Sequence, residues 1–228
     1  MRINYWQTFY EGCFYHIYNR AIGRAWLFAN DENNHYFLKK WKQYIHPYIE
    51  TYAYCLMVNH FHFLVRVRRI DNAMRQQIEQ ENTVASRKFL NGEIEFNTFL
   101  EDQFKRLFSA YTLAYNKQQS RHGSLFQESF KRIQIGNEVK LINTLCYIHH
   151  NPIHHDASPF YDVWTFSSFK AYLSQANTLI ERQEGLKLFD GMGVNSKAFE
   201  NYHETYRQSK TAFRQHIDED DNLIIDGD

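Results

Sequence analysis

The chain has 228 residues, 43% of them hydrophobic and 17% aromatic, which is enough apolar material for the core of one domain with an extension. Nine glycines and three prolines exclude a low-complexity or linker-rich protein. The formal net charge is zero, but residues 217–228 hold six acidic residues and no lysine or arginine. Without them, 26 basic residues stand against 20 acidic ones, and a basic body with an acidic tail is compatible with a DNA partner.

Cysteine usage and the N-terminal residues predict the cellular compartment. Cys13, Cys55 and Cys146 are far apart, odd in number, and each lies in an apolar run, which indicates buried free thiols and offers no cysteine-based metal spacing. Residues 1–12 lack the apolar run of a signal peptide, and no apolar stretch of ~20 residues follows. We therefore expect a soluble, cytoplasmic protein.

The first predicted strand covers residues 12–20, where aromatic and β-branched side chains alternate with polar ones. Successive strand residues point to opposite faces, so one face carries Cys13, Tyr15 and Ile17 and the other Phe14, His16, Tyr18 and Arg20. The second set could meet a ligand, or it could belong to an ordinary amphipathic edge strand.

A helix and a second strand follow. Asp31 is a suitable N-cap for a helix whose apolar residues recur at helical spacing until Pro47, a pattern that indicates core packing. Residues 50–57 form the second predicted strand. Val58-Asn59 can make a turn, which would pair this strand with the next as an antiparallel hairpin; the alternative is one long strand that continues into His60.

The most informative stretch is LMVNHFHFLVRV, residues 56–67, which is rich in aromatic and β-branched residues and alternates strictly. The alternation points Phe61, Phe63, Val65 and Val67 into a core and His60, His62, Leu64 and Arg66 to the opposite face. Two imidazoles beside a cation suit a divalent metal that holds a phosphate; two half-buried histidines on an exposed face are the alternative.

The remaining pattern predicts the fold class. Residues 69–97 are polar and mixed in charge, with helical character over 73–90, and a long helix with an apolar stripe from Leu100 to Tyr115 follows. Residues 129–135 alternate as a fourth strand, and Asn137 caps a helix that runs to about His150. The order βαββαβα is that of a ferredoxin-like or RRM-like α+β fold, with an antiparallel sheet of four to five strands and helices on one face.

The helix after Asn137 carries a second group of polar side chains. Its core stripe is Leu141, Leu145 and Ile148, and the opposite face holds Lys140, Asn143, Tyr147 and Asn151 at spacings of three and four. Pro152 is expected to end the helix, which would fix Asn151 where its amide oxygen could complete a metal site. A tyrosine, with an ordinary pKa of ~10, becomes a nucleophile only with help such as a nearby metal.

These residues, taken together and in order, resemble the HUH single-tyrosine transposases, and most closely the REP-associated tyrosine transposases, also called IS200-like transposases. The resemblance covers residues 12 to about 172 and has one departure, Val58 where proline is usual. The matching segments are Tyr15-His16-Ile17-Tyr18-Asn19-Arg20, Tyr54-Cys55-Leu56-Met57, Asn59-His60-Phe61-His62, Leu64-Val65, Phe130-Lys131-Arg132-Ile133, Tyr147-Ile148-His149-His150-Asn151-Pro152 and Trp164-Thr165-Phe166-Ser167-Ser168-Phe169.

The resemblance implies a specific chemistry. His60 and His62, with Asn151 as third ligand, would bind Mg²⁺ or Mn²⁺, and the catalytic helix would cross the open face of the sheet. Tyr147 would attack single-stranded DNA and form a 5′-phosphotyrosine link with a free 3′-hydroxyl, at hairpins of repetitive extragenic palindromes. The candidates for DNA contacts are Arg66, Lys131, Arg132, Lys140, His150, Tyr18 and His16.

Several alternatives and boundaries stay open at this point. His149, His154 and His155 are expected at the surface, because their spacing matches no closed zinc site. We expect a catalytic domain over 1–180, a polar insertion at about 69–97 and a helical C-terminal extension with an acidic tail over 181–228. A monomer is preferred and a homodimer is possible. The competing functions are a hairpin-binding module without catalysis and a metal phosphodiesterase without a covalent intermediate.

Overall fold

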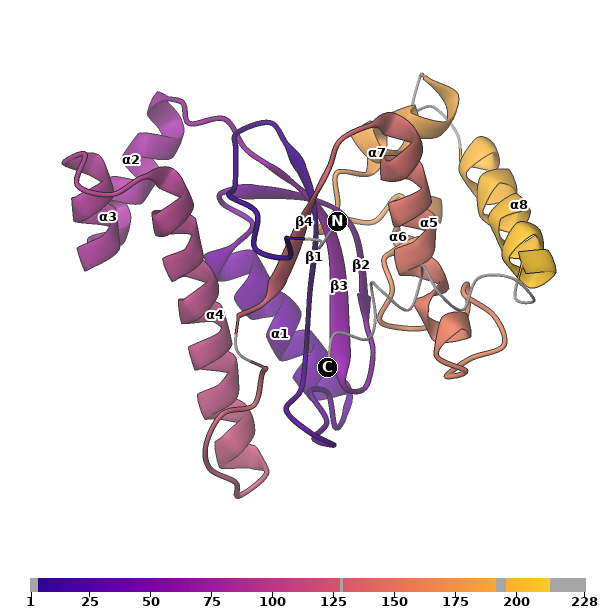
Figure 1. Cartoon of the computed structure of the whole chain (residues 1–228), viewed down its shortest axis with the longest axis horizontal. Coiled ribbons are helices and arrows are strands. Elements are labelled where there is room, and N and C mark those ends of the chain that lie inside the picture. Colours follow the sequence, from indigo (N-terminus) through magenta and orange to yellow (C-terminus); the bar gives the residue numbers. More distant parts are fainter. Residues whose placement is uncertain (1–3, 128, 192–195, 214–228) are drawn as a thin grey trace. The chain divides into compact units, whose positions relative to one another are not determined.

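The computed structural model describes residues 4–127, 129–191 and 196–213, and Figure 1 shows the arrangement of its elements. The chain divides into two compact units, Met1–Arg182 and Gln183–Asp228, and the residues of the candidate site lie in the first. No described helix is long and apolar enough to cross a membrane. The elements are β1 (Phe14–Arg20), α1 (Asp31–Tyr44), β2 (Ile49–Leu56), β3 (His60–Val67), α2 (Asn72–Glu81), α3 (Val84–Leu90), α4 (Phe96–Gln118), β4 (Lys131–Ile135), α5 (Glu138–His154), α6 (Phe169–Leu173), α7 (Arg182–Asp190) and α8 (Lys197–Phe213).

The four strands form one antiparallel sheet in the order β2-β3-β1-β4. This agrees with the ferredoxin-like α+β fold class predicted from the sequence. Strands β2 and β3 form an antiparallel hairpin with a turn at residues 57–59. Of the two alternatives, a hairpin or one long strand, the hairpin is therefore confirmed. In the register of β1 and β3, Tyr18 lies opposite His62 and Arg20 opposite His60. The segment around Ser167 pairs with the free edge of β2 through an antiparallel bridge to Cys55.

The main core lies between the sheet and α1 and α4, which cover one face (Figure 1). Phe61, Phe63 and Val65 point into it from β3, as the alternation predicts, and the Trp41 ring of α1 stacks on Phe63 with centroids 3.6 Å apart. Helix α1 starts one residue earlier than predicted. Asn30, not Asp31, is its N-cap, because Asn30 has the extended backbone and its side chain accepts from the Asn33 amide.

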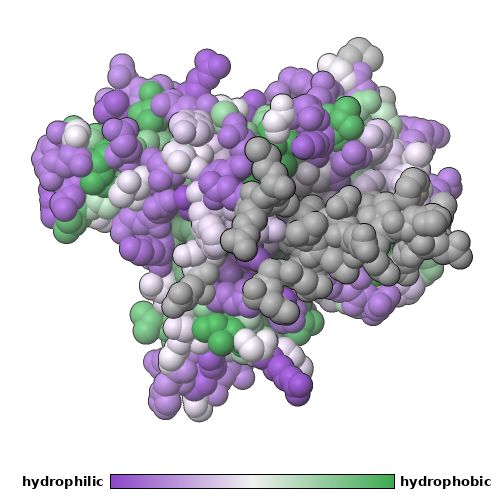
Figure 2. Space-filling model, in the orientation of Figure 1, coloured by the Kyte–Doolittle hydropathy of each residue, from purple (hydrophilic) through white to green (hydrophobic). Residues whose placement is uncertain are grey.

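The segment 69–97 forms two short helices rather than one helical stretch. Asp71 caps α2 and Thr83 caps α3 with a capping box. Met74, Ile78 and Phe89 join the main core, so a polar sequence still packs through a few apolar residues. On the face shown in Figure 2, hydrophilic side chains predominate over these helices and the hydrophobic spots are small and scattered.

Helix α5 packs against β2, β3 and β4 on the sheet face opposite α1 and α4 (Figure 1). It begins as predicted, with the Asn137 side chain accepting from the Lys140 amide at 2.9 Å. The prediction that Pro152 ends the helix is wrong, since α5 continues to His154. A proline near the end removes one backbone donor, and the last turn is closed by the His155 amide, which donates to the Asn151 carbonyl at 3.0 Å.

Candidate active site

Two elements bring polar side chains together where α5 crosses the sheet. Strand β3 supplies His60 and His62, and α5 supplies Tyr147 and Asn151. The Tyr147 ring lies edge-on to His62, with centroids 5.7 Å apart, and His60 Nε2 lies 3.4 Å from Asn151 Oδ1. Residues 60 and 147 are far apart in sequence, so this convergence depends on α5 lying over the face that carries the histidines.

His60 and Asn151 face each other through two hydrogen-bond acceptors. Burial lowers the pKa of His60 to about 3, so its ring is neutral at pH 7 and has one proton. Asn59 Oδ1 lies 2.7 Å from His60 Nδ1 and can only accept, so the ring proton sits on Nδ1 and Nε2 keeps its lone pair. Asn151 Nδ2 donates to the Tyr147 carbonyl at 3.1 Å, which turns Oδ1 toward His60. Two lone pairs directed at each other suit a cation between them.

His62 is the second possible nitrogen ligand. It is buried, and its Nδ1 lies 2.9 Å from His16 Nε2. Burial, followed by the neighbouring imidazoles, holds the pKa of His62 well below its usual range, and burial lowers the pKa of His16 to about 3. Both rings are therefore neutral at pH 7 and can act as ligands or as acceptors. The amide oxygen is a ligand type that suits Mn²⁺ and Mg²⁺, whereas imidazole nitrogens are more typical ligands of transition metals such as Zn²⁺ and Fe²⁺.

Two histidines beside the site were expected at the surface. The His155 ring lies 4.4 Å from His60, and the His154 ring stacks on Tyr147 at 5.3 Å between centroids. His154 is seven residues after Tyr147, and His155 is four after Asn151, so a helix that continued past residue 152 would have placed both on the same face. Because the helix was expected to end at Pro152, His154 and His155 were not predicted to lie on this face.

His149 is a further correction, because it is fully buried instead of exposed. Its Nε2 lies 2.8 Å from the hydroxyl of Ser168, whose backbone amide donates to the Tyr54 carbonyl of β2 at 2.9 Å. The histidine thus ties α5 to the segment that extends the edge of the sheet. No group of three or more His, Cys, Asp and Glu side chains within the described ranges could hold a metal. The Asn151 amide oxygen, 3.4 Å from His60 Nε2, is a residue of another type that could serve as a third protein ligand.

The predicted DNA contacts separate into different surroundings. Arg132 lies opposite Ile17, on the core side of β4, where its guanidinium binds the Gln7 carbonyl at 2.5 Å and the Glu101 carboxylate. Its side chain is 8% exposed, so a DNA contact at Arg132 does not fit this arrangement. Lys131, one residue earlier, points to the other face, with its ammonium 5.7 Å from the Tyr18 ring centre.

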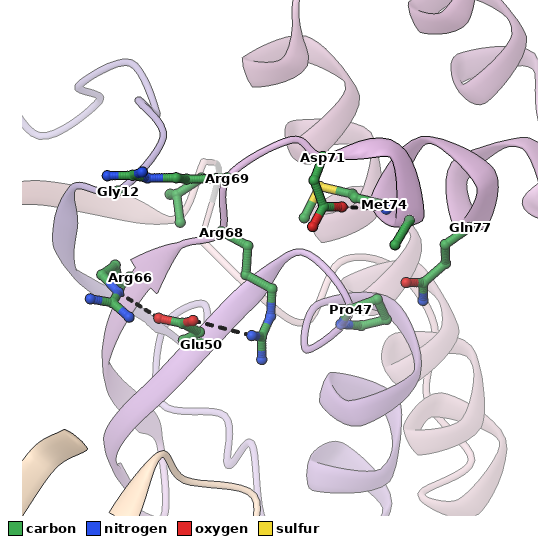
Figure 3. Close-up of a pocket in the computed structure, with 11 residues that line it drawn as sticks. Gly12, Pro47, Glu50, Arg66, Arg68, Arg69, Asp71, Met74 and Gln77 are labelled. Carbon is green, nitrogen blue, oxygen red and sulfur yellow. Dashed lines mark hydrogen bonds and ion pairs between the residues drawn. The ribbon is translucent and has the colours of Figure 1, made fainter. Parts of the chain in front are cut away.

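Arg66 lies on the histidine face but toward the other end of β3. It pairs with Glu50 at 2.5 Å, and Arg68 binds the same carboxylate at 3.2 Å, as Figure 3 shows. These side chains line a pocket of about 570 Å³ together with Arg69 and Asp71. The two carboxylates offset much of the arginine charge, which weakens this pocket as a phosphate site.

Three of the predicted contacts lie inside the molecule. His16, Tyr18 and His150 are 4%, 8% and 2% exposed, respectively, and His150 Nδ1 lies 2.8 Å from the Cys146 carbonyl. Helix α5 covers the sheet face that the alternation assigned to His16 and Tyr18, so base stacking by these two rings does not fit this arrangement. His150 is buried within α5 itself, so a DNA contact there does not fit either. Lys140, in contrast, is exposed in the first turn of α5.

Comparisons with known proteins agree with the resemblance identified in the sequence. No family model matches the chain. A protein of Haemophilus influenzae described as "Putative REP-associated tyrosine transposase" is 26% identical over 169 residues, which are 73% of this chain and 85% of that protein. The solved structure of a REP-associated tyrosine transposase bound to a REP hairpin matches with a TM-score of 0.50 and 15% identity, over 78% of this chain and 94% of the other. The second match concerns the fold alone.

Proposed function

We propose that this chain nicks and rejoins single-stranded DNA at hairpins of repetitive palindromic elements. The proposal starts from its sequence and structural similarity to REP-associated tyrosine transposases. The observation that carries the proposal is the convergence of His60, His62 and Asn151 beside the ring of Tyr147. A phosphodiesterase site would need the metal ligands alone. A tyrosine held against one of the ligands favours attack by the protein itself.

Each residue of the site has a role in this proposal. His60 Nε2, His62 Nε2 and Asn151 Oδ1 would hold Mg²⁺ or Mn²⁺, which when bound would draw charge from the phosphate oxygens and favour phenolate. Lys131 and the exposed Lys140 would contact the DNA backbone.

The proposed reaction exchanges one phosphodiester bond for another. Tyr147 Oη attacks the phosphorus as it loses its proton, the bond from phosphorus to the 3′-oxygen breaks, and that oxygen gains a proton. The products are a 5′-phosphotyrosine and a free 3′-hydroxyl. Attack by a 3′-hydroxyl of another strand reverses the same steps, releases Tyr147 and joins the strands, so no external energy source is required.

A doubly labelled hairpin oligonucleotide tests the proposal. With Mn²⁺, the 3′-labelled fragment should migrate with the protein in a denaturing gel, while the 5′-labelled fragment is released with an end that a polymerase extends. Tyr147→Phe, which keeps the ring, should abolish the covalent product without loss of hairpin binding. Cleavage that survives Tyr147→Phe would indicate a metal phosphodiesterase, and binding without cleavage in wild type would indicate a hairpin-binding module.

The role of Asn151 is tested separately with the metal alone. Asn151→Ala removes an oxygen ligand and should weaken Mn²⁺ binding by about 10- to 100-fold, measured from the electron paramagnetic resonance signal of free Mn²⁺. Asn151→Asp restores an oxygen and should bind at least as well as wild type, since carboxylates suit Mn²⁺. Equal affinity in the alanine variant and wild type would remove Asn151 from the site.

A further inference from the structure

We infer that His16 is a positioning residue for His62: its Nε2 accepts the proton of His62 Nδ1–H and so leaves the Nε2 lone pair of His62 free for a metal ion. The inference rests on the proposed function, because it concerns a residue that orients one of the proposed metal ligands. It replaces the expectation that His16 contacts DNA. The contact that carries it is the 2.9 Å separation between His16 Nε2 and His62 Nδ1.

The sheet register explains why these two rings meet. Tyr18 lies directly opposite His62 in the antiparallel pair of β1 and β3, and His16 is two residues away on the same face. Diagonal neighbours of this kind lie within reach of aromatic-sized side chains. Both residues lie on paired strands of the sheet. A pair of strands holds two side chains in a more constant position than a loop does.

The hydrogen bond permits only two arrangements of neutral rings. If His16 donates from Nε2, His62 must carry its own proton on Nε2, and that nitrogen cannot bind a metal. If His62 donates from Nδ1, His16 accepts and His62 Nε2 presents a lone pair. Metal-bound histidines usually donate their second N–H to a fixed acceptor, and His16 is the acceptor that the fold supplies.

The neighbours of His62 hold this geometry. The Tyr18 ring stacks on it at 5.5 Å and 21°, and the His16 ring lies at 5.1 Å and 24°. Tyr147 closes the site edge-on from α5. His60 has a corresponding partner in Asn59, so each predicted nitrogen ligand is oriented through its Nδ1 by a side chain of its own.

The tautomer can be read without metal or substrate. In ¹⁵N-resolved NMR spectra of the metal-free chain, His62 should carry its proton on Nδ1, and His16→Leu should shift it toward the mixture of tautomers seen in free histidine. A His62 proton on Nε2 in wild type would overturn the inference. This readout is independent of cleavage and of metal binding, so it stands even if the proposed reaction fails.

Metal titrations give the second test. His16→Leu should weaken Mn²⁺ binding by about 10- to 100-fold, and His16→Gln, whose amide oxygen can accept the same proton, should restore most of it. In a His62→Gln background His16→Leu should have no further effect, because its partner is gone. Tyr18→Phe, which removes only a hydroxyl beside the same ring, is the matched control. An unchanged affinity in His16→Leu, with binding still dependent on His60 and His62, would overturn the inference and leave the proposed function standing.

Discussion

The imidazoles of His16, His60 and His62 are neutral in the folded chain because they are packed between the sheet and α5. Burial is the leading cause of the lowered pKa of each ring, and none has an acidic partner among the described contacts that would favour the charged form. A histidine must be neutral to bind a metal ion. The packing that keeps these rings neutral therefore favours metal binding, and it also lowers the stability of the chain in acid.

This coupling predicts a pH dependence of stability. Unfolded histidine has a pKa of ~6.5, whereas His16 and His60 have values of about 3 when folded, so below pH ~6.5 the unfolded chain binds more protons. Their contribution is complete above pH ~6.5 and is lost as the pH falls toward 3. The free energy of unfolding of the metal-free chain, from urea titrations, should drop by about 2 kcal/mol per buried histidine between pH 7 and 5.

Two substitutions distinguish this effect from general acid sensitivity. His16→Gln removes one buried titrating ring and should make the pH dependence shallower by about one proton. His122 is exposed, so His122→Gln should leave the curve unchanged. A wild-type chain equally stable at pH 7 and 5 would contradict the argument.

Single residues also show what alternation can and cannot predict. The period of two correctly separated His60 and His62 from Phe61 and Phe63, because that separation is a property of one strand. Arg132 was placed beside Lys131 as a DNA contact, although neighbouring strand residues point to opposite faces. Its actual partners, Gln7 and Glu101, lie 125 and 31 residues away, a pairing that no local pattern contains.

At the scale of elements, α5 determines whether the site exists, since it carries both Tyr147 and Asn151. It is fixed at its start by the Asn137 cap and in its last turns by the contact of His149 with Ser168. Ser168 in turn belongs to the segment that pairs with the edge of β2. The helix is therefore attached to the sheet by named polar contacts in addition to its apolar stripe.

The cap offers a test of the helix separate from the chemistry. Asn137→Ala removes the side-chain acceptor of the Lys140 amide and should lower the free energy of unfolding by about 1 kcal/mol. Asn137 lies ten residues before Tyr147, about 15 Å along the axis, so Mn²⁺ affinity should stay within twofold of wild type. Asn137→Ser, which keeps a capping oxygen, should retain most of the stability. A large loss of metal affinity without loss of stability would contradict the argument that the cap acts on stability alone.

The elements themselves were largely predictable. Each strand and each core helix has a clear period, and the strand order follows from the order of elements. The resemblance also predicts that the catalytic helix crosses the open face of the sheet, and α5 lies there. What could not be predicted is which side chains that helix buries. Until α5 is placed there, Tyr18 and His16 look like exposed ligand-facing residues; once it is placed, they are buried and contact His62. The same placement turns His149 from a surface residue into a structural one.

For the whole molecule, charge is distributed unevenly along the sequence. Residues 217–228 hold six of the 26 acidic residues and no lysine or arginine. In the rest of the chain, 26 basic residues stand against 20 acidic ones. DNA affinity depends strongly on the charge that the protein brings to the phosphates, and like charges repel over about 10 Å at 0.1 M salt. If the chain binds hairpin DNA as proposed, this acidic segment should therefore weaken the binding.

Removal of residues 217–228 changes the formal net charge from zero to +6 and should strengthen binding to a fluorescent hairpin, measured by anisotropy. We expect a severalfold gain at 50 mM salt that fades by 200 mM, because screening shortens the range of the repulsion. A full-length variant with the six acids replaced by their amides should show the same gain, which separates charge from chain length. If only the truncation strengthens binding, the segment acts by occupying space; if neither does, its charge does not reach the DNA.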